Sequence, residues 1–134
     1  MNMSEKREIE TGSFADVADL VEDAIEDGVE ARPRNDDKRY RVDDVAIACM
    51  WTPRNRSNLR RLSHCWVAED ARGEDIGKSL VERRFEDAKR EGADKIDSYA
   101  YREQLYEEPG FEARESYDMG TTHMVWERGG GEDG

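Results

Sequence analysis

The sequence has no long apolar run and contains only two cysteines. No segment approaches the ~20 apolar residues of a membrane-spanning helix, so we expect no contact with a bilayer. Residues 1–10 are polar and acidic and lack the apolar core of a secretory signal, which predicts a cytoplasmic protein. Cys49 and Cys65 would then lie in a reducing compartment, and without CxxC spacing they favour neither a disulfide nor a metal site.

The sequence has fewer basic than acidic residues. Its 134 residues include 21 basic and 33 acidic side chains, a net charge of -12. Such a surface repels phosphates, which excludes DNA and RNA as expected partners. Most basic residues are Arg, and the acidic ones are spread along the whole chain, as in proteins from extreme halophiles. Carboxylates stay hydrated in molar salt, where a Debye length of ~3 Å screens their repulsion. An acidic protein from an ordinary cell is the alternative.

Apolar periodicity predicts one domain over residues 1–128, followed by a disordered Gly-rich acidic tail over 129–134. Ser13 and Asp16 form a capping box for a helix that ends at Gly28, and a second helix is expected over 76–91. Strands are expected over 7–11, 40–42, 45–52, 59–67, 95–99, 112–117 and 122–127, with a loop over 29–38 and a short helix over 102–107. This order predicts an α+β or mixed α/β domain with a central sheet and helices on both faces.

The junction between the strand over 59–67 and the next helix is a candidate anion site. The first N–H groups of a helix have no intrahelical partner, and the helix dipole adds positive charge there. Gly73 and Gly77 let the backbone approach a phosphate, while Arg72 and Lys78 supply cationic side chains. Residues 73–79 read GxxxGKS, one residue short of a Walker P-loop, and GxGxxG is absent. The alternative is an ordinary charged loop that caps a helix.

The segment 67–80 resembles the acetyl-coenzyme A motif [QR]xxGx[GA] of the GNAT N-acetyltransferase superfamily. The matching residues are Val67 in the preceding strand, Arg72, Gly73, Ile76, Gly77 and Leu80. A second family motif, LYxxxGF, is matched by residues 105–111, in the family's order after one long helix and one strand. The last strand is similar to the family's terminal strand. The resemblance covers residues 44–127.

The chain departs from the family pattern at several positions. Asp75 replaces the middle glycine of the first motif, and a carboxylate ~5 Å from a phosphate would cost roughly 3 kcal/mol at an effective dielectric of about 20. Molar salt would remove much of that cost, and Asp75 could also point outward or cap the helix. Tyr99 and Arg102 replace residues common upstream of LYxxxGF, and Pro109 precedes Gly110. These changes bear on cofactor affinity more than on fold.

The resemblance implies acetyl-coenzyme A as co-substrate and a V-shaped splay between the strands over 59–67 and 95–99. It implies that the pantetheine arm enters this gap beside Trp66 and Val67. The implied pyrophosphate site is formed by Arg72, Gly73, Glu74, Asp75, Ile76, Gly77 and Lys78. The implied acceptor is a primary amine of a small molecule or protein, which attacks the thioester directly without a metal.

Two candidate catalytic residues follow from the resemblance and from the strand pattern. Tyr106 occupies the family's general-acid position, and a phenol, with a reference pKa near 10, can donate its proton to the leaving thiolate. Alternatively, Tyr106 packs against Phe111. His64 is a candidate general base, since period-two alternation places it with Leu62 and Trp66. A partly buried structural histidine is the alternative.

The same alternation places Ser63 and Cys65 on the opposite face with Val67, where either could orient a water. Cys65 is disfavoured as a nucleophile because no basic partner is evident on its face. His123 could instead reach the site from the last strand pair. The charge run over 82–90 is expected to be a solvated helix face.

The leading hypothesis is therefore a small GNAT-type acetyltransferase. A second hypothesis is an acyl-coenzyme A-binding module without turnover, which Asp75 favours. A third is a small interaction protein whose terminal strands pair into a homodimer. The acceptor is not identified by any motif.

Overall fold

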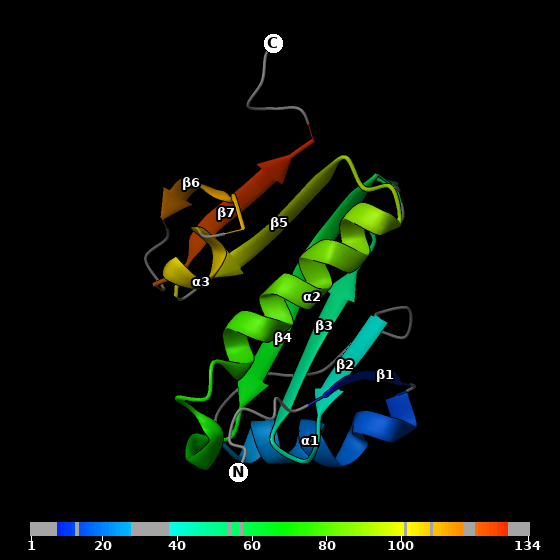
Figure 1. Cartoon of the computed structure of the whole chain (residues 1–134), viewed down its shortest axis with the longest axis vertical. Coiled ribbons are helices and arrows are strands. Elements are labelled where there is room, and N and C mark those ends of the chain that lie inside the picture. The colour runs from blue at the N-terminus through cyan, green and yellow to red at the C-terminus, as the bar shows by residue number, and fades with distance from the viewer. Residues whose placement is uncertain are drawn as a thin grey trace.

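A computed structural model describes residues 8–12, 14–27, 38–53, 55–56, 58–100, 102–107, 109–116 and 120–128, with the backbone alone for Phe14 and His64. The elements are β1 Ile9–Gly12, α1 Phe14–Glu26, β2 Lys38–Val42, β3 Ala46–Trp51, β4 Leu59–Val67, the 3-10 helix η1 Glu69–Ala71, α2 Ile76–Arg90, β5 Lys95–Ala100, α3 Gln104–Glu107, β6 Glu112–Ser116 and β7 Thr122–Glu127. The strands form one sheet in the order β1-β2-β3-β4-β5-β7-β6 (Figure 1). The expected mixed α/β fold is confirmed.

The two longer helices cover opposite faces of the sheet. On one face, α2 buries Leu80, Val81, Phe85 and Ala88 against Tyr40, Met50, Leu62, Ile96 and Met124. On the other face, α1 buries Val17, Leu20, Val21 and Ala24 against Ile47 and Trp66. Because the α1 cluster includes no residue of β5, β6 or β7, the described part of the chain leaves that half of the α1 face without a helix over it.

Most element boundaries agree with the sequence prediction to within two residues, because they follow apolar periodicity. The predicted Ser13 cap, the loop up to β2 and the tail lie outside the described residues. No helix in the described ranges has the length and apolarity to span a membrane. The charge run over 82–90 is not wholly a solvated face, because Arg84 and Asp87 are buried.

A buried carboxylate connects α2 to β2. Tyr40 Oη donates a hydrogen bond of 2.8 Å to Asp87 Oδ2, and Arg83 Nε lies 3.2 Å from the same oxygen. Burial alone would raise the pKa of Asp87, but the Tyr40 hydrogen bond and the charges of Arg83 and Lys38 hold it below its ordinary value. Desolvation and the bond to Asp87 raise the pKa of Tyr40. Asp87 is therefore ionised at neutral pH inside the fold.

β4 and β5 separate along their length. They pair in parallel only at Leu59–Lys95, Arg60–Ile96 and Arg61–Asp97. Beyond these pairs the strands diverge toward the N-terminal end of α2 (Figure 1), while β5 stays paired with β7 along its whole length. The expected splay is therefore present, and it leaves the facing edges of β4 and β5 without a ladder partner within the described sheet.

A β-bulge in β4 changes which side chains share a face. Ser63 pairs with Cys49 and Cys65 pairs with Ala48, so His64 is the extra residue. Leu62 consequently belongs to the α2 cluster whereas Trp66 belongs to the α1 cluster. The predicted common face for Leu62 and Trp66 is therefore wrong, because strict alternation cannot anticipate an inserted residue.

Candidate active site

A cavity of about 450 Å³ lies where β4 and β5 part. Its lining comes from β4, the start of α2, β5 and α3: Leu62, Ser63, Cys65, Trp66, Val67, Arg72, Gly77, Val81, Arg84, Ser98, Tyr99, Ala100, Arg102, Leu105 and Tyr106. Three of these side chains are Arg, and none of the described lining residues is acidic. In a chain with a net charge of -12, this is a local reversal of charge that suits an anionic ligand.

Hydroxyl groups bridge the inner end of the cavity. Ser98 Oγ on β5 donates a hydrogen bond of 2.8 Å to the Leu62 carbonyl on β4, and it lies 3.3 Å from Tyr106 Oη. The Tyr106 ring is 7% exposed and makes an edge contact with Phe111, with ring centroids 5.4 Å apart. Both sequence interpretations of Tyr106 are thus compatible with its position, since the ring packs while the residue lines the cavity.

The loop that leads into α2 contains two left-handed residues. Gly73 has φ of 98°, and Asp75, directly before α2, has φ of 63°. Asp75 occupies the N-cap position, but its side chain is exposed and makes no capping hydrogen bond. The hypothesis of a side-chain cap is therefore wrong. A left-handed φ favours glycine, so the aspartate at this position has a strained backbone.

Arg72 joins the loop to the end of α1. Its Nε donates to the Val67 carbonyl at 2.9 Å, and its Nη2 lies 3.0 Å from Asp27 Oδ2. The Trp66 indole also donates to Asp27, at 3.0 Å. The Trp66 side chain therefore packs beneath α1, although the residue contributes to the cavity wall. No pattern in the sequence links residues 27, 66 and 72.

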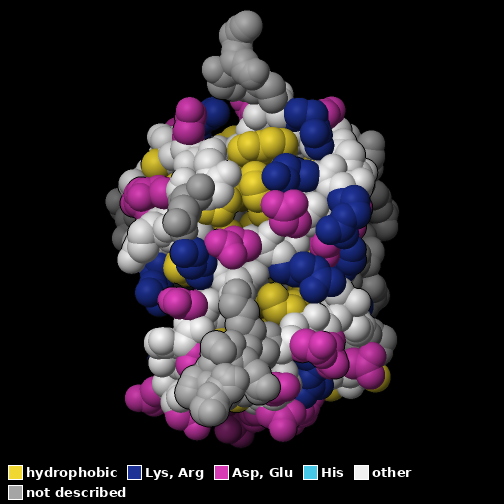
Figure 2. Space-filling model, in the orientation of Figure 1, with side chains coloured by type: hydrophobic (Ala, Val, Ile, Leu, Met, Phe, Trp, Pro, Cys, Tyr) yellow, Lys and Arg dark blue, Asp and Glu magenta, His cyan; other side chains and the backbone are white. Residues whose placement is uncertain are grey.

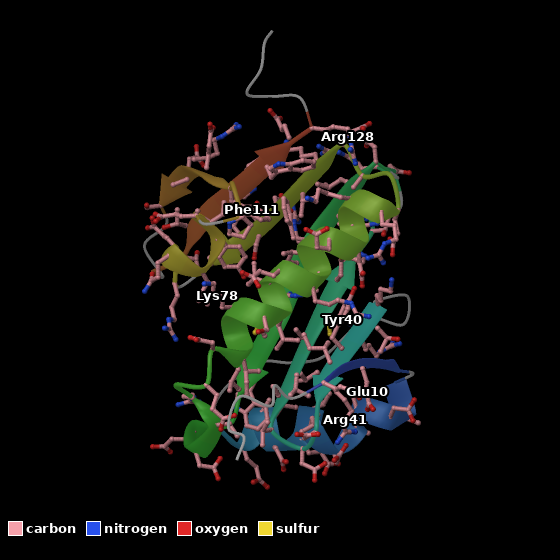
Figure 3. The ribbon with its side chains drawn as sticks, viewed as in Figure 1. Glu10, Tyr40, Arg41, Lys78, Phe111 and Arg128 are labelled. Atoms are coloured by element: carbon pink, nitrogen blue, oxygen red, sulfur yellow. The ribbon has the colours of Figure 1, made fainter. Side chains whose placement is uncertain are left out.

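The remaining motif residues belong to the loop before α2 and to its first turn. Glu74 is exposed, whereas Ile76 is buried at the start of α2. Gly77 lines the cavity, and a Cβ built there would lie 3.6 Å from Leu105 on α3, an ordinary contact. Lys78 projects from the first turn of α2 on the side where α3 lies (Figure 3). Of the seven predicted anion-binding residues, Arg72 and Gly77 line the cavity, and the others lie next to them in the chain.

Arg84 is a buried cation within the charge run over 82–90 that the sequence predicted to be a solvated helix face. Its Nε donates to the Leu80 carbonyl at 3.0 Å, and Nη1 contacts the Cys49 and Ser63 carbonyls at 3.0 and 3.3 Å. The side chain is 0% exposed, and Nη2 has no hydrogen-bond partner in the described structure. Arg84 therefore cross-links α2 to the two strands on either side of the bulge.

Cys65 is the cysteine that reaches the cavity. Its side chain is exposed, yet the protein atoms around its sulfur raise the pKa of the thiol through desolvation, an effect that the charge of Arg84 only partly opposes. The thiol is therefore protonated at neutral pH, which argues against a nucleophilic role. Cys49 is buried, and both thiols are free.

A second group of polar side chains lies on the α1 face at the apex of the splay. Asp97 Oδ1 and Oδ2 accept hydrogen bonds of 2.9 Å from Arg61 Nε and Nη2, and His123 Nε2 is 2.9 Å from Asp97 Oδ2. The rings of Tyr99 and His123 stack with centroids 4.5 Å apart. We call Arg61, Asp97, Tyr99 and His123 the Asp97 cluster. Only His123 was a candidate from sequence; the side chain of His64 is outside the described atoms.

No protein-family model and no curated protein matches this sequence. Solved structures do resemble it. A GNAT superfamily phosphinothricin acetyltransferase from Sinorhizobium meliloti, in complex with AcCoA, is 17% identical with a TM-score of 0.73, over 92% of this chain and 89% of that chain. ElaA of Escherichia coli is 19% identical with a TM-score of 0.71, over 91% and 100%. An acetyltransferase of Bacillus subtilis in complex with CoA is 18% identical with a TM-score of 0.63, over 91% and 99%. The chain therefore has the GNAT acetyltransferase fold.

Proposed function

We propose that this protein is an N-acetyltransferase that transfers the acetyl group of acetyl-coenzyme A to a primary amine. The observation that carries the proposal is the cavity between the parted strands, which is lined by three arginines and by no described acidic residue. Coenzyme A carries several phosphate charges, and two structures of the same fold are described as complexes with CoA or AcCoA. The acid-rich composition supports the further proposal that the enzyme works in molar salt in the cytoplasm.

The proposed cofactor position uses features of both strands. The unpaired edge of β4 near Cys65 and Val67 offers main-chain groups to the amides of the pantetheine arm, as an added strand would. The diphosphate would lie against the backbone N–H groups between Arg72 and Lys78, at the start of α2. A Cβ at Gly77 would lie 3.6 Å from Leu105, an ordinary contact, so the protein around this position would also accommodate a small side chain.

Acetyl transfer requires three catalytic functions from the chain. A main-chain N–H on the open edge of β4 polarises the thioester carbonyl, a base accepts a proton from the attacking amine, and an acid protonates the leaving thiolate. Tyr106 is the proposed acid, because it lines the cavity beside Ser98. The histidines His64 and His123 are the two candidates for the base.

A second candidate function is an acyl-coenzyme A-binding module without turnover. Asp75 favours it, since an exposed carboxylate stands at the entrance to the proposed diphosphate site. Calorimetric titration with acetyl-coenzyme A in molar KCl tests binding, and release of free thiol in the presence of a panel of primary amines tests turnover. Binding without thiol release would support the module. The absence of saturable binding would contradict both functions and leave the dimeric interaction protein.

Replacement of Tyr106 by Phe tests the proposed acid. We expect thiol release to slow by roughly ten-fold or more, because the thiolate would leave without a proton donor. The ring contact with Phe111 is retained, so the melting temperature and the affinity for acetyl-coenzyme A should change little. Phe111→Leu is the matched control, since it alters that packing and leaves the phenol in place. An unchanged rate in Tyr106→Phe would remove Tyr106 from the mechanism.

A further inference from the structure

We propose that His123, oriented by Asp97, accepts the proton of the attacking amine, and that the amine reaches the cavity from the α1 face of the sheet. This inference rests on the proposed acetyltransferase function and assigns its base. Its first support is the contact of 2.9 Å between His123 Nε2 and Asp97 Oδ2. A carboxylate acceptor places the ring proton on Nε2, so Nδ1 keeps the lone pair that can take a proton.

Asp97 can orient the imidazole because Arg61 holds it in place. It is 2% exposed, and Arg61 binds both of its carboxylate oxygens at 2.9 Å. Its carboxylate therefore lies in a fixed position against the ring on which positive charge forms when His123 takes a proton. Glu115 on β6 pairs with His123 across the ladder, so a second carboxylate side chain belongs to the same face. The groups that face this histidine are therefore Asp97 and the Tyr99 ring, which contact it, Arg61, which binds Asp97, and Glu115, its ladder partner.

The Asp97 cluster meets the cavity at Tyr99. Tyr99 lines the cavity, pairs with His123 in the β5–β7 ladder and stacks on its ring at 4.5 Å. The sequence neighbours Ile96 and Met124 point into the α2 cluster, so alternation turns Asp97 and His123 to the other face. In agreement, the view from the α2 side shows no histidine among the coloured side chains (Figure 2).

The α1 face is the accessible side of this part of the sheet. α2 and α3 pack on the opposite face, and the described part of the α1 cluster stops at β4. Tyr99 is 44% exposed and the His123 side chain is 19% exposed. An amine that approaches the cavity from this face therefore passes these two rings before it meets the thioester.

Ser63 gives an independent indication that a ligand belongs here. Its Oγ is buried, has no hydrogen-bond partner in the described structure, and belongs to a residue that lines the cavity. Ser63 pairs with Cys49, whose neighbours Ala48 and Met50 face α2, so its side chain is on the α1 face. A buried hydroxyl without a partner is destabilising, and a polar group of the acceptor would satisfy it.

One proton leaves the amine and one reaches the thiolate in the proposed reaction. The amine nitrogen forms a bond to the acetyl carbon, its proton passes to His123 Nδ1, and the carbon–sulfur bond breaks. The thiolate takes the proton of Tyr106. The products are an amide and a free thiol. His123 then releases its proton to solvent while Tyr106 regains one, which restores the starting state.

The two histidines of the chain make the test direct. His123→Gln and His64→Gln are assayed over about pH 5.5 to 9 with acetyl-coenzyme A and an amine found in the thiol-release screen. We expect His123→Gln to lose roughly a hundred-fold or more in kcat and to lose the fall in rate at acid pH. Its acetyl-coenzyme A affinity should match wild type. His64→Gln should keep that acid fall. Glu112→Gln, on the exposed face of β6, is the matched control with unchanged kinetics.

Rescue separates a catalytic role from a structural one. In His123→Ala, added imidazole should restore part of the thiol release, since it supplies the missing base, and should not do so in Tyr106→Phe. If the Gln variant does not fold, His123→Asn replaces it in the same assay. Retention of the acid fall in the His123 variants, its loss in His64→Gln, or the absence of rescue would each overturn the proposal. Absence of thiol release from the wild-type chain would instead contradict the proposed function itself.

Discussion

Asp75 combines a strained backbone with an unfavourable charge. Its φ of 63° lies in the left-handed region, which costs a residue with a side chain roughly 1–2 kcal/mol. Its exposed carboxylate stands at the start of α2, beside the proposed diphosphate site. Neither effect is offset by a side-chain hydrogen bond to the helix.

We therefore expect Asp75→Gly and Asp75→Asn to bind acetyl-coenzyme A about five-fold more tightly in dilute buffer, because a like charge leaves the site. The gain should shrink in molar KCl, where such repulsion is screened. Calorimetry at both salt concentrations measures this, with Glu86→Gln on the exposed side of α2 as the control. Equal affinity of wild type and both variants in dilute buffer would contradict a diphosphate site at this loop.

The residue types in the sequence predicted where the site lies, but they did not predict which side chains contact one another there. The glycines, Arg72 and Tyr106 could be placed near one junction because their spacing matches two motifs. The ion pair of Arg72 with Asp27 and the Asp97 cluster could not be predicted, since they join segments 45 and 26 residues apart in the sequence. Such pairings depend on tertiary packing, which no local spacing encodes.

At the scale of single elements, α2 differs from an ordinary amphipathic helix because it buries Arg84 toward the sheet. We expect Arg84→Met to lower the free energy of unfolding by about 2–4 kcal/mol, because the carbonyls of Cys49 and Ser63 lose their buried donor. Denaturant titration measures the loss. Arg90→Met on the exposed side of the same helix should change stability by less than ~1 kcal/mol.

Arg84→Lys should be intermediate, since an ammonium keeps the charge but cannot bridge both strands with fork geometry. If Arg84→Met proved as stable as wild type, the cross-link to the bulge would have no energetic role. If Arg84→Met bound acetyl-coenzyme A as tightly as wild type, the buried charge would also have no part in the affinity of the cavity.

The strands and helices themselves were accessible from the sequence, because runs such as residues 46–51 and the apolar spacing in 76–90 dictate their type. The bulge at His64 was not accessible. It is defined by the register between β3 and β4, and one inserted residue reverses the face of every side chain after it. The predicted common faces of Leu62 with Trp66 and of Ser63 with Cys65 were wrong for that reason, whereas Cys65 and Val67 do share the α2 face.

The whole molecule carries its excess of carboxylates outside the cavity. Figure 2 shows Asp and Glu side chains gathered over the end where α1 lies, and the net charge is -12. The fold class could be predicted because element order and two motifs agree, whereas the separation of a basic cavity from an acidic exterior required the three-dimensional arrangement.

We expect the melting temperature to rise by several degrees between about 0.1 M and about 3 M KCl, because screening removes repulsion among the carboxylates. Differential scanning calorimetry measures the change. Sucrose at equal osmolality is the control, since it favours compact states without screening charge. A melting temperature that responds equally to both solutes, or that falls in KCl, would contradict adaptation to molar salt.

Only three residue pairs join β4 to β5, so the sheet consists of two half-sheets, one of four strands and one of three. Apart from those pairs, the two half-sheets are joined by the hydrophobic cluster under α2, the Ser98 bridge, the Arg61–Asp97 ion pair and the hydrogen bonds from the Asp94 and Lys95 amides to the Asn58 carbonyl. A ligand in the gap would add contacts to both half-sheets along the edges that lack ladder partners. Because one hydrophobic cluster spans both half-sheets, the empty chain should melt as one unit, and occupancy of the gap should raise its melting temperature.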